Sequence, residues 1–403
     1  MPRSNQAMRP EPSVFDAWLQ QEAFHSLASA TAGKPHGELL AWQKQYIDEQ
    51  LRFRSRMRRR FPIEQSWLWT DRSLSQASDW WSASYKASLF PAGVCVLDAC
   101  CGAGVDSVAL AQRGHVVAMD NAAETLAIAR ANVTGHVGQD CQFEALCGSF
   151  PEDIPADVRW MHADPDRRPP DKSASERKTL RADMFMPSLE SLLEYADTIE
   201  GAAIKIAPST VFSEECLEKV EESTQRVWLG VFGECRQQLL LSGALRSKET
   251  PQRKVVLCHP ARAEFAGNVE ELASWSEAPA SFVYDLHPAL FASQLHNAWA
   301  NQHALTTLGS DLGYFTSDTL VESPFAQSFQ VVDTLAWDDR KVRKWLRQND
   351  AGIVDIKNRG LRLDAGHFQR RYSNPDGKQP FSLLVTQLGQ RVRAIVCRRI
   401  ASE

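Results

Sequence analysis

A glycine-rich turn between an apolar run and an apolar helix most limits what this chain can fold into. Residues 96–106 read VLDACCGAGVD, with an acid at Asp98 and glycines at Gly102 and Gly104. Glycines are needed where a ligand must approach the backbone without a Cβ in the way, and the helix that follows presents free N–H groups to that ligand. The pattern indicates a strand, a turn and a helix that bind a nucleotide-sized ligand.

Short β-rich runs alternate with helix-length segments from residue 94 onward. Helix-length segments such as 106–113 and 122–132 separate the earlier runs. Alternation of this kind predicts an α/β fold with a Rossmann-like, doubly wound and mainly parallel sheet, covered by helices on both faces. The expected strands are 94–99, 115–119, 141–146, 158–162, 202–207, 227–231 and 254–258.

The chain length predicts more than one domain, because single cores stop growing at roughly 250 to 300 residues and this chain has 403. Residues 14–89 have apolar and aromatic positions three or four apart, which is typical of helices. We therefore expect a helical N-terminal region over 1–89, the sheet domain over 90–260, a linker over 261–279 and a small α+β domain over 280–403.

Composition excludes several classes of protein. No run approaches the roughly 18 apolar residues of a membrane-spanning helix, and the N-terminus does not have the pattern of a signal peptide. The nine cysteines are scattered and odd in number, and they form no paired CxxC ligands. We expect a cytoplasmic protein with no membrane segment, no metal site and no disulfide framework.

Two ligand classes compete for the glycine turn. A dinucleotide site favours GxGxxG, whereas Ser107 stands at the third glycine position here. Asp98 favours S-adenosylmethionine, because a carboxylate can accept the ammonium of its amino-acid moiety. Asp120 lies 22 positions further along, at the end of the next expected strand, where an acid can take both ribose hydroxyls. These acids favour S-adenosylmethionine over a nicotinamide cofactor, and a turn that only joined strand to helix would leave both unexplained.

The motifs resemble those of class I methyltransferases, with DACCGAGVDS at 98–107, VVAMDN at 116–121 and HADPDRR at 162–168. With further segments such as IKIAP at 204–208, YFTSD at 314–318 and DIKNRG at 355–360, the chain resembles an uncharacterised bacterial family over about residues 65–400. That family couples a methyltransferase domain to a C-terminal THUMP-like domain. The resemblance implies S-adenosylmethionine as cofactor, bound by Asp98, Cys100, Gly102, Gly104, Asp106, Asp120, Asn121 and Ser149.

The fourth motif suggests the methyl acceptor. Amine-methylating relatives have Asp or Asn, two prolines and an aromatic ring, and this chain keeps only Asp164 and Pro165 of that set. A carboxylate and a backbone carbonyl at an X-Pro turn can accept the two hydrogens of an exocyclic amine and aim its lone pair at the methyl carbon. In place of the ring, Arg167 or Arg168 could stack on a base or bind a phosphate. Alternatively, these arginines pair with nearby acids and only order the loop.

The charge distribution suggests RNA as the partner. The net charge is −5, yet residues 331–403 carry 15 lysines and arginines against 8 aspartates and glutamates. A second basic run contains Arg52, Arg54, Arg56, Arg58, Arg59 and Arg60. We expect both regions to bind RNA, and the enzyme to methylate a nucleobase amine in rRNA or tRNA. The alternatives are a methyltransferase for a small molecule or a protein, and an inactive S-adenosylmethionine-binding module that binds RNA.

Other polar residues have simpler explanations. His162 lies within an expected strand, so we predict a packed, hydrogen-bonded imidazole rather than a general base. Lys205 ends a strand beside the cofactor cleft, where a salt bridge and a role in the site are equally compatible with the sequence. Most of the twelve tryptophans are expected to pack in cores or domain interfaces.

Overall fold

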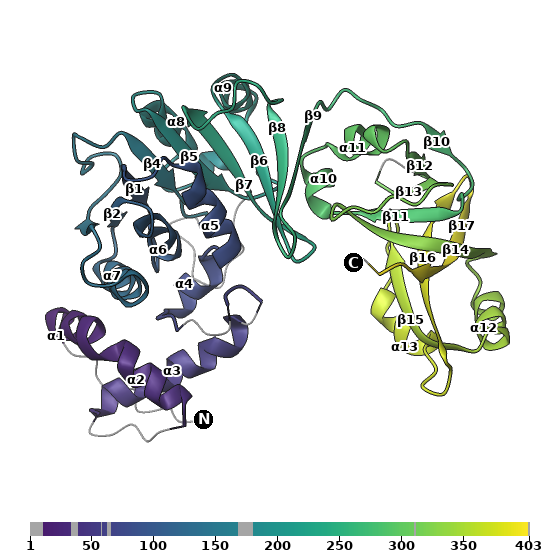
Figure 1. The fold of residues 1–403 in the computed structure, drawn as a ribbon, viewed down its shortest axis with the longest axis horizontal. Helices are drawn as coiled ribbons and strands as arrows, with labels where there is room; N and C mark the ends of the chain where they lie inside the picture. The colour runs from purple at the N-terminus through teal and green to yellow at the C-terminus, as the bar shows by residue number, and fades with distance from the viewer. Residues whose placement is uncertain are drawn as a thin grey trace. The chain divides into compact units, whose positions relative to one another are not determined.

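The chain divides into two units in the computed structural model, which describes residues 11–33, 39–57, 59–62, 66–167, 180–309 and 312–401. Unit 1 comprises residues 1–226 and 237–248, and unit 2 comprises residues 227–236 and 249–403. The ribbon colour follows the chain from purple through teal in unit 1 to green and yellow in unit 2 (Figure 1). The domain boundaries expected near residues 89, 260 and 280 remain predictions.

Unit 1 begins with helices, as the sequence predicts. Polar side chains define two of the starts: Thr70 and Ser73 form a capping box ahead of α4, and Asp79 accepts a hydrogen bond from the Ser82 N–H ahead of α5. The helices are α1 (Pro12–Trp18), the π-helix η1 (Leu19–Ala23), α2 (Phe24–Thr31), α3 (Ala41–Met57), α4 (Asp71–Gln76) and α5 (Trp80–Leu89).

A mainly parallel sheet forms the centre of unit 1, in the order β3-β2-β1-β4-β5-β7. The first five strands are parallel and β7 is antiparallel to β5, so the predicted Rossmann-like sheet is confirmed. Strand β7 was not predicted from the sequence, because it begins with polar residues. The strands are β1 (Cys95–Ala99), β2 (His115–Asp120), β3 (Phe143–Cys147), β4 (Trp160–Ala163), β5 (Gly201–Ile206) and β7 (Glu234–Gly243).

Helices cover both faces of this sheet (Figure 1). On one face, Leu97, Met161 and Ile204 form an apolar core with α8 (Leu189–Ala196) and α9 (Glu214–Ser223), which follow the short 3-10 helix η2 (Ala182–Met184). Because side chains alternate along a strand, the neighbours Asp98, His162 and Lys205 point to the opposite face. There α5 packs on α6 (Val105–Ala111), and α6 packs on α7 (Ala123–Val137).

Unit 2 contains an eight-stranded sheet in the order β10-β12-β13-β11-β14-β17-β16-β15. Its strands are β10 (Trp275–Ser276), β11 (Phe282–Leu286), β12 (Thr306–Leu308), β13 (Tyr314–Ser317), β14 (Ala326–Ala336), β15 (Ala351–Asn358), β16 (Gln379–Leu388) and β17 (Arg391–Arg399). The helices of unit 2 are α10 (Pro288–Ala292), α11 (His296–Gln302), α12 (Asp339–Gln348) and α13 (Ala365–Tyr372). Three strands come before β10 in the chain: β6 (Gln225–Val231), β8 (Arg253–His259) and β9 (Ala263–Gly267).

The segment 261–279, which the sequence analysis expects to be a linker, contains strands β9 and β10. Strand β9 lies within it and pairs antiparallel with β8, and the short β10 pairs with β12. These strands are short and mostly half-buried or exposed, so they lack the apolar alternation by which a strand is recognised from sequence. In the described part of the chain, no helix is both long enough and apolar enough to cross a membrane.

Candidate active site

The turns that follow β1 and β2 meet at the carboxyl edge of the unit 1 sheet. The Gly102 N–H donates to Oδ2 of Asp120 at 3.1 Å, and the Ala122 N–H donates to Oδ1 at 3.0 Å. Burial raises the pKa of the Asp120 carboxyl, and these two backbone hydrogen bonds oppose that shift. Asp120 therefore connects the predicted cofactor turn after β1 to the end of β2, and its side chain stays partly exposed there.

The two motif glycines have different reasons to be glycine. Both have positive φ, +56° at Gly102 and +77° at Gly104. A Cβ on Gly104 would lie 2.9 Å from the Cβ of Ala129 in α7, whereas a Cβ on Gly102 would meet nothing within 4 Å. Gly104 thus permits helix packing, and Gly102 leaves open space beside the turn.

Cys100 also has a positive φ, 62°, which is uncommon outside glycine. Burial raises the pKa of its thiol, and the carboxylates of Asp120 and Asp164 raise it further. The thiol is therefore neutral at physiological pH, and Cys100 shapes the turn without supplying a charge.

Asp98 is fully buried and already has protein partners on both oxygens. His162 Nδ1 lies 2.7 Å from Oδ1, and the Ser107 hydroxyl donates to Oδ2. The imidazole of His162 is packed and hydrogen-bonded, as the sequence predicts. The contact of Asp98 with a cofactor ammonium stays a prediction.

Asp106 is held by residues that precede the sheet. Lys86 Nζ lies 2.7 Å from Oδ1, and the Ser78 hydroxyl donates to Oδ2 at 2.9 Å. Burial opposes ionisation of Asp106, but the ammonium of Lys86, together with His162, outweighs burial and holds the carboxyl pKa below its usual range. The side chain of Asp106 therefore fixes α5 against α6.

The loop after β3 contains Asp153, which was not among the residues predicted from the sequence for this site. Asp153 accepts the Ser149 N–H at 2.9 Å, and both residues are exposed, as is Asn121 at the end of β2. The roles of Ser149 and Asn121 in cofactor binding stay predictions. The Asp153 carboxylate therefore fixes the backbone of Ser149 within this loop.

The segment Asp164-Pro165-Asp166, here called the acceptor turn, follows β4 at the same edge. The Asp164 N–H donates to the Ala99 carbonyl at 3.2 Å, which anchors the turn to β1. The Asp164 carboxylate forms an ion pair with Lys205 of β5, and the Asp164 side chain is 24% exposed. The structure therefore brings the predicted catalytic acid close to the glycine turn.

Asp166 is held by α4 and by the segment that precedes α8. Arg72 Nη2 lies 2.5 Å from Oδ2, and Gln76 Nε2 donates to Oδ1 at 2.7 Å. The backbone of Asp166 also exchanges two hydrogen bonds with Met186, at 2.8 and 2.9 Å. Arg167 is half-buried, while Arg168 lies outside the described residues.

This edge fits S-adenosylmethionine. The open space at Gly102 admits a ligand against the backbone, and each oxygen of the partly exposed Asp120 carboxylate keeps a lone pair for a ribose hydroxyl. The side chain of Asp164, at the same edge of the sheet, is partly exposed to solvent. Over the described ranges, no three His, Cys, Asp or Glu side chains are grouped in a way that could hold a metal ion.

The arginine run over residues 52–60, which begins in α3 and continues past its end at Met57, has a structural part and an exposed part. Arg56 pairs with Asp71 at 2.6 Å, and Arg60 donates to the carbonyls of Leu74 and Ala77. Arg52 and Arg59 are exposed, and Arg58 lies outside the described residues. Arg56 and Arg60 therefore hold α4 in place.

In unit 2, α12 presents the exposed cations Arg340, Lys341, Lys344 and Arg347. Val342 and Leu346 on its other side are buried in the core beside β15 and β16. The exposed side of this helix is therefore a basic surface within the C-terminal part of the chain.

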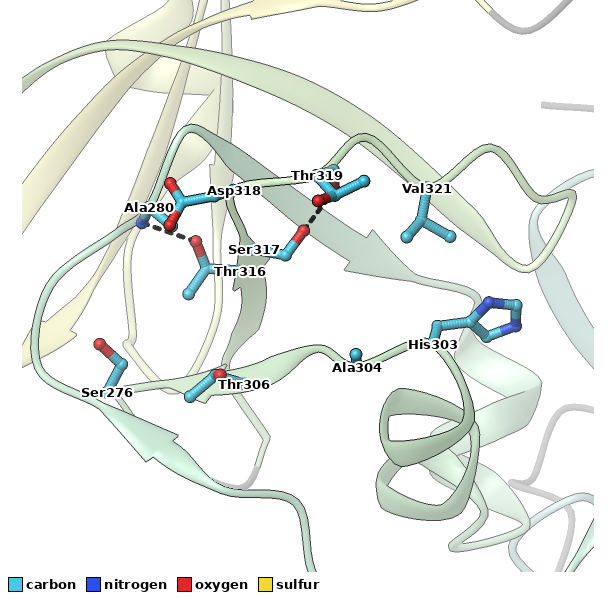
Figure 2. A pocket seen from close by; sticks show the side chains of 10 residues that line it. All are labelled: Ser276, Ala280, His303, Ala304, Thr306, Thr316, Ser317, Asp318, Thr319 and Val321. Atoms are coloured by element: carbon cyan, nitrogen blue, oxygen red, sulfur yellow. Dashed lines mark hydrogen bonds between the residues drawn. The ribbon is translucent and has the colours of Figure 1, made fainter.

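A separate hollow of about 560 Å³ lies in unit 2 (Figure 2). Its hydroxyl groups are used within the protein: Thr316 accepts the Ala280 N–H at 2.8 Å, and Ser317 donates to the Thr319 carbonyl at 2.5 Å. Asp318 accepts two hydrogen bonds from Ser281. None of the lining residues is Lys or Arg, so the lining supplies no lysine or arginine cation to a ligand.

Two family models match separate segments of the chain. Residues 96–163 match a family model described as a methyltransferase domain, and residues 326–399 match one described as THUMP domain-like. The first range covers β1 to β4 and the second covers β14 to β17. The methyltransferase domain and the C-terminal THUMP-like domain indicated by the motifs are therefore confirmed.

Individual relatives agree with this assignment. Two strains of Mycobacterium tuberculosis, CDC 1551 and H37Rv, each have a protein named as an uncharacterized S-adenosylmethionine-dependent methyltransferase. Each is 28% identical to this chain over 341 residues, which is 82% of this chain and 89% of the relative. A crystal structure from Porphyromonas gingivalis W83, described as a methyltransferase, shares the fold with a TM-score of 0.73 at 17% identity, covering 98% of this chain and 100% of that one.

Proposed function

We propose that this protein is an S-adenosylmethionine-dependent methyltransferase that methylates an exocyclic amine of a nucleobase in RNA, with rRNA or tRNA as its substrate. The observation that carries the proposal is the acceptor turn, which lies beside the glycine turn at the carboxyl edge of the sheet. Ligands bind at this edge in doubly wound sheets.

S-adenosylmethionine supplies an electrophilic methyl group when it is bound. The residues of the chain bind and aim the reactants: Asp120 and the Gly102 backbone form the cofactor side, and Asp164 forms the acceptor side. An amine donates one hydrogen to the Asp164 carboxylate and the other to the backbone carbonyl at Pro165, which directs its lone pair forward. As the nitrogen becomes positive, the nearby carboxylate stabilises the developing charge.

Two features support RNA as the substrate. One is the THUMP-like domain at residues 326–399. The other is the pair of basic surfaces, formed by the exposed Arg52 and Arg59 in and after α3 and by the basic side of α12. Phosphate backbones attract such surfaces without regard to sequence. We propose the cytoplasm as the compartment.

Labelled transfer tests this proposal. The purified protein is incubated with methyl-labelled S-adenosylmethionine and an extract of cells that lack the gene, and the RNA, protein and small-molecule fractions are counted separately. We expect label in RNA, and nucleoside analysis should place it on a base nitrogen. Label in protein or small molecules would favour the alternative substrates, and RNA binding without any transfer would favour an inactive module.

A further inference from the structure

The acceptor turn is held by the sheet on one side and by helix α4 on the other. Only the contact with the sheet is expected from the methyltransferase motif. From the sheet, Lys205 of β5 forms an ion pair with Oδ2 of Asp164. The Lys205 side chain is 9% exposed, against 24% for Asp164. Among the described residues, no hydrogen bond reaches Oδ1 of Asp164, so both lone pairs of this oxygen are available to a substrate N–H.

Helix α4 of the N-terminal region holds the same turn from the other side. Arg72 and Gln76 bind the two carboxylate oxygens of Asp166, at 2.5 and 2.7 Å. The main-chain carbonyl of Gln76 also lies 3.5 Å from Nζ of Lys205. Helix α4 therefore contacts both Lys205, which pairs with Asp164, and Asp166 of the acceptor turn.

Helix α4 is in turn fixed by α3 and by the turn that follows α3. Arg56 pairs with Asp71 at its first residue, and Arg60 binds the Leu74 and Ala77 carbonyls at its end. The contacts thus run without a break from α3, through α4, to the acceptor turn.

We propose that Lys205 is a positioning residue for Asp164 and that α4, through Gln76 and Arg72, clamps the acceptor turn in its working geometry. This inference rests on the proposed function, in which Asp164 accepts a substrate N–H. The lysine occupies one carboxylate oxygen and fixes the direction of the other. A displacement of about 1 Å at such a group can cost on the order of 100-fold in rate.

Because the clamp depends on the charge of Lys205, the rate of methyl transfer should depend on pH. Burial lowers the pKa of Lys205, Lys86 of α5 lowers it further, and the carboxylates of Asp164 and Asp106 oppose both effects. The ion pair exists below this pKa and is lost above it, so transfer should decline at a lower pH than the roughly 10.4 of an ordinary lysine. An arginine at position 205 stays charged at every accessible pH and should remove this decline.

Two measurements on the full-length protein test the clamp. The first is hydrogen exchange in peptides that contain residues 163–167, because the Asp166 N–H is bonded to Met186 in the clamped turn. The second is the single-turnover rate with labelled S-adenosylmethionine and RNA from cells that lack the gene. The variants are Lys205→Met, Lys205→Arg and Gln76→Leu. The controls are Lys219→Met on α9 and Gln112→Leu, which follows α6.

We expect faster exchange in Lys205→Met and Gln76→Leu, a roughly 100-fold lower rate in Lys205→Met, and unchanged binding of adenosylhomocysteine. Lys205→Arg should restore much of the rate and lose the alkaline decline. If exchange and rates in both clamp variants match those of the controls, the inference is wrong. If Lys205→Met fails to fold, Gln76→Leu alone decides. If wild-type protein labels no RNA, the proposed function fails, and the exchange data still decide whether the clamp exists.

Discussion

The Nζ atom of Lys86 lies 2.7 Å from Oδ1 of Asp106, with both side chains buried. This ion pair joins α5, which precedes the sheet, to α6, which begins at the cofactor turn. Removing one partner of a buried pair leaves an uncompensated charge, which is more damaging than removing both.

Lys86→Met should therefore lower the free energy of unfolding by about 3 to 5 kcal/mol. The double variant Lys86→Met/Asp106→Leu should recover part of that loss, because no buried charge is left alone. Urea denaturation of both variants measures this. Equal losses in the single and double variants would contradict a stabilising role for the pair.

The same pair predicts a dependence of stability on pH. The folded-state pKa of Asp106 is lowered, so the pair stabilises the fold above the unfolded value of about 3.9 and loses that contribution as pH falls toward the folded value. The stability difference between wild type and Asp106→Asn should be constant near neutral pH and shrink below about pH 4. A difference that stays constant down to the acid transition would refute this linkage.

The two motif glycines should respond differently to alanine. Gly104→Ala should destabilise the protein by roughly 2 kcal/mol or more, because it combines a positive φ with a clash against Ala129. Gly102→Ala has only the positive φ and should cost about 1 kcal/mol. Its Cβ would fill the open space at the turn, so cofactor affinity should fall more than stability. Thermal unfolding and calorimetry separate the two effects.

Asp120→Ala should weaken binding of S-adenosylmethionine by about 1.5 to 3 kcal/mol, the range for hydrogen bonds to a charged group. The matched control is Asp140→Ala, which removes an exposed acid from the turn ahead of β3. Calorimetry with S-adenosylmethionine and with NAD tests both the cofactor assignment and the contribution of Asp120 to binding. Tighter binding of NAD than of S-adenosylmethionine by wild type would contradict the cofactor assignment.

The local part of the site could be predicted from sequence. The apolar runs, the glycine spacing and the acids at the ends of expected strands place Asp120 and Asp164 at one edge, because parallel strands share a direction. The partners of these acids could not be predicted. Gln76 and Asp166 are 90 positions apart, and nothing in local periodicity links α4 to a turn after β4.

Two predicted cofactor residues already have partners within the protein, and their contacts with a cofactor stay predictions. The sequence favours Asp98 as a ligand-binding acid because it ends the first strand, and Asp106 is implied by the family resemblance. The structure shows both side chains bonded within the protein, to His162 and Ser107 and to Lys86 and Ser78. Sequence spacing places a residue near a site, but the direction of its side chain depends on the helices that pack over the strand.

The basic side of α12 provides a test of RNA capture. Lys341→Ser, Lys344→Ser and Arg347→Ser together should make the slope of log affinity against log salt less negative by about 2, at roughly 0.7 for each phosphate contact with single-stranded RNA. Lys219→Ser in α9 is the matched control, and cofactor affinity should stay unchanged throughout. An unaltered slope would exclude this helix from the RNA-binding surface.

The central claim is that Asp164 is the acceptor-side residue of an RNA methyltransferase. The most direct test compares single-turnover methyl transfer to RNA by wild type and Asp164→Ala, with adenosylhomocysteine affinity measured on the same samples. We expect a loss of transfer on the order of 100-fold with cofactor affinity nearly unchanged, as for an interaction made with the reacting group. Transfer at the wild-type rate in Asp164→Ala would contradict the claim and place the reaction elsewhere on the protein.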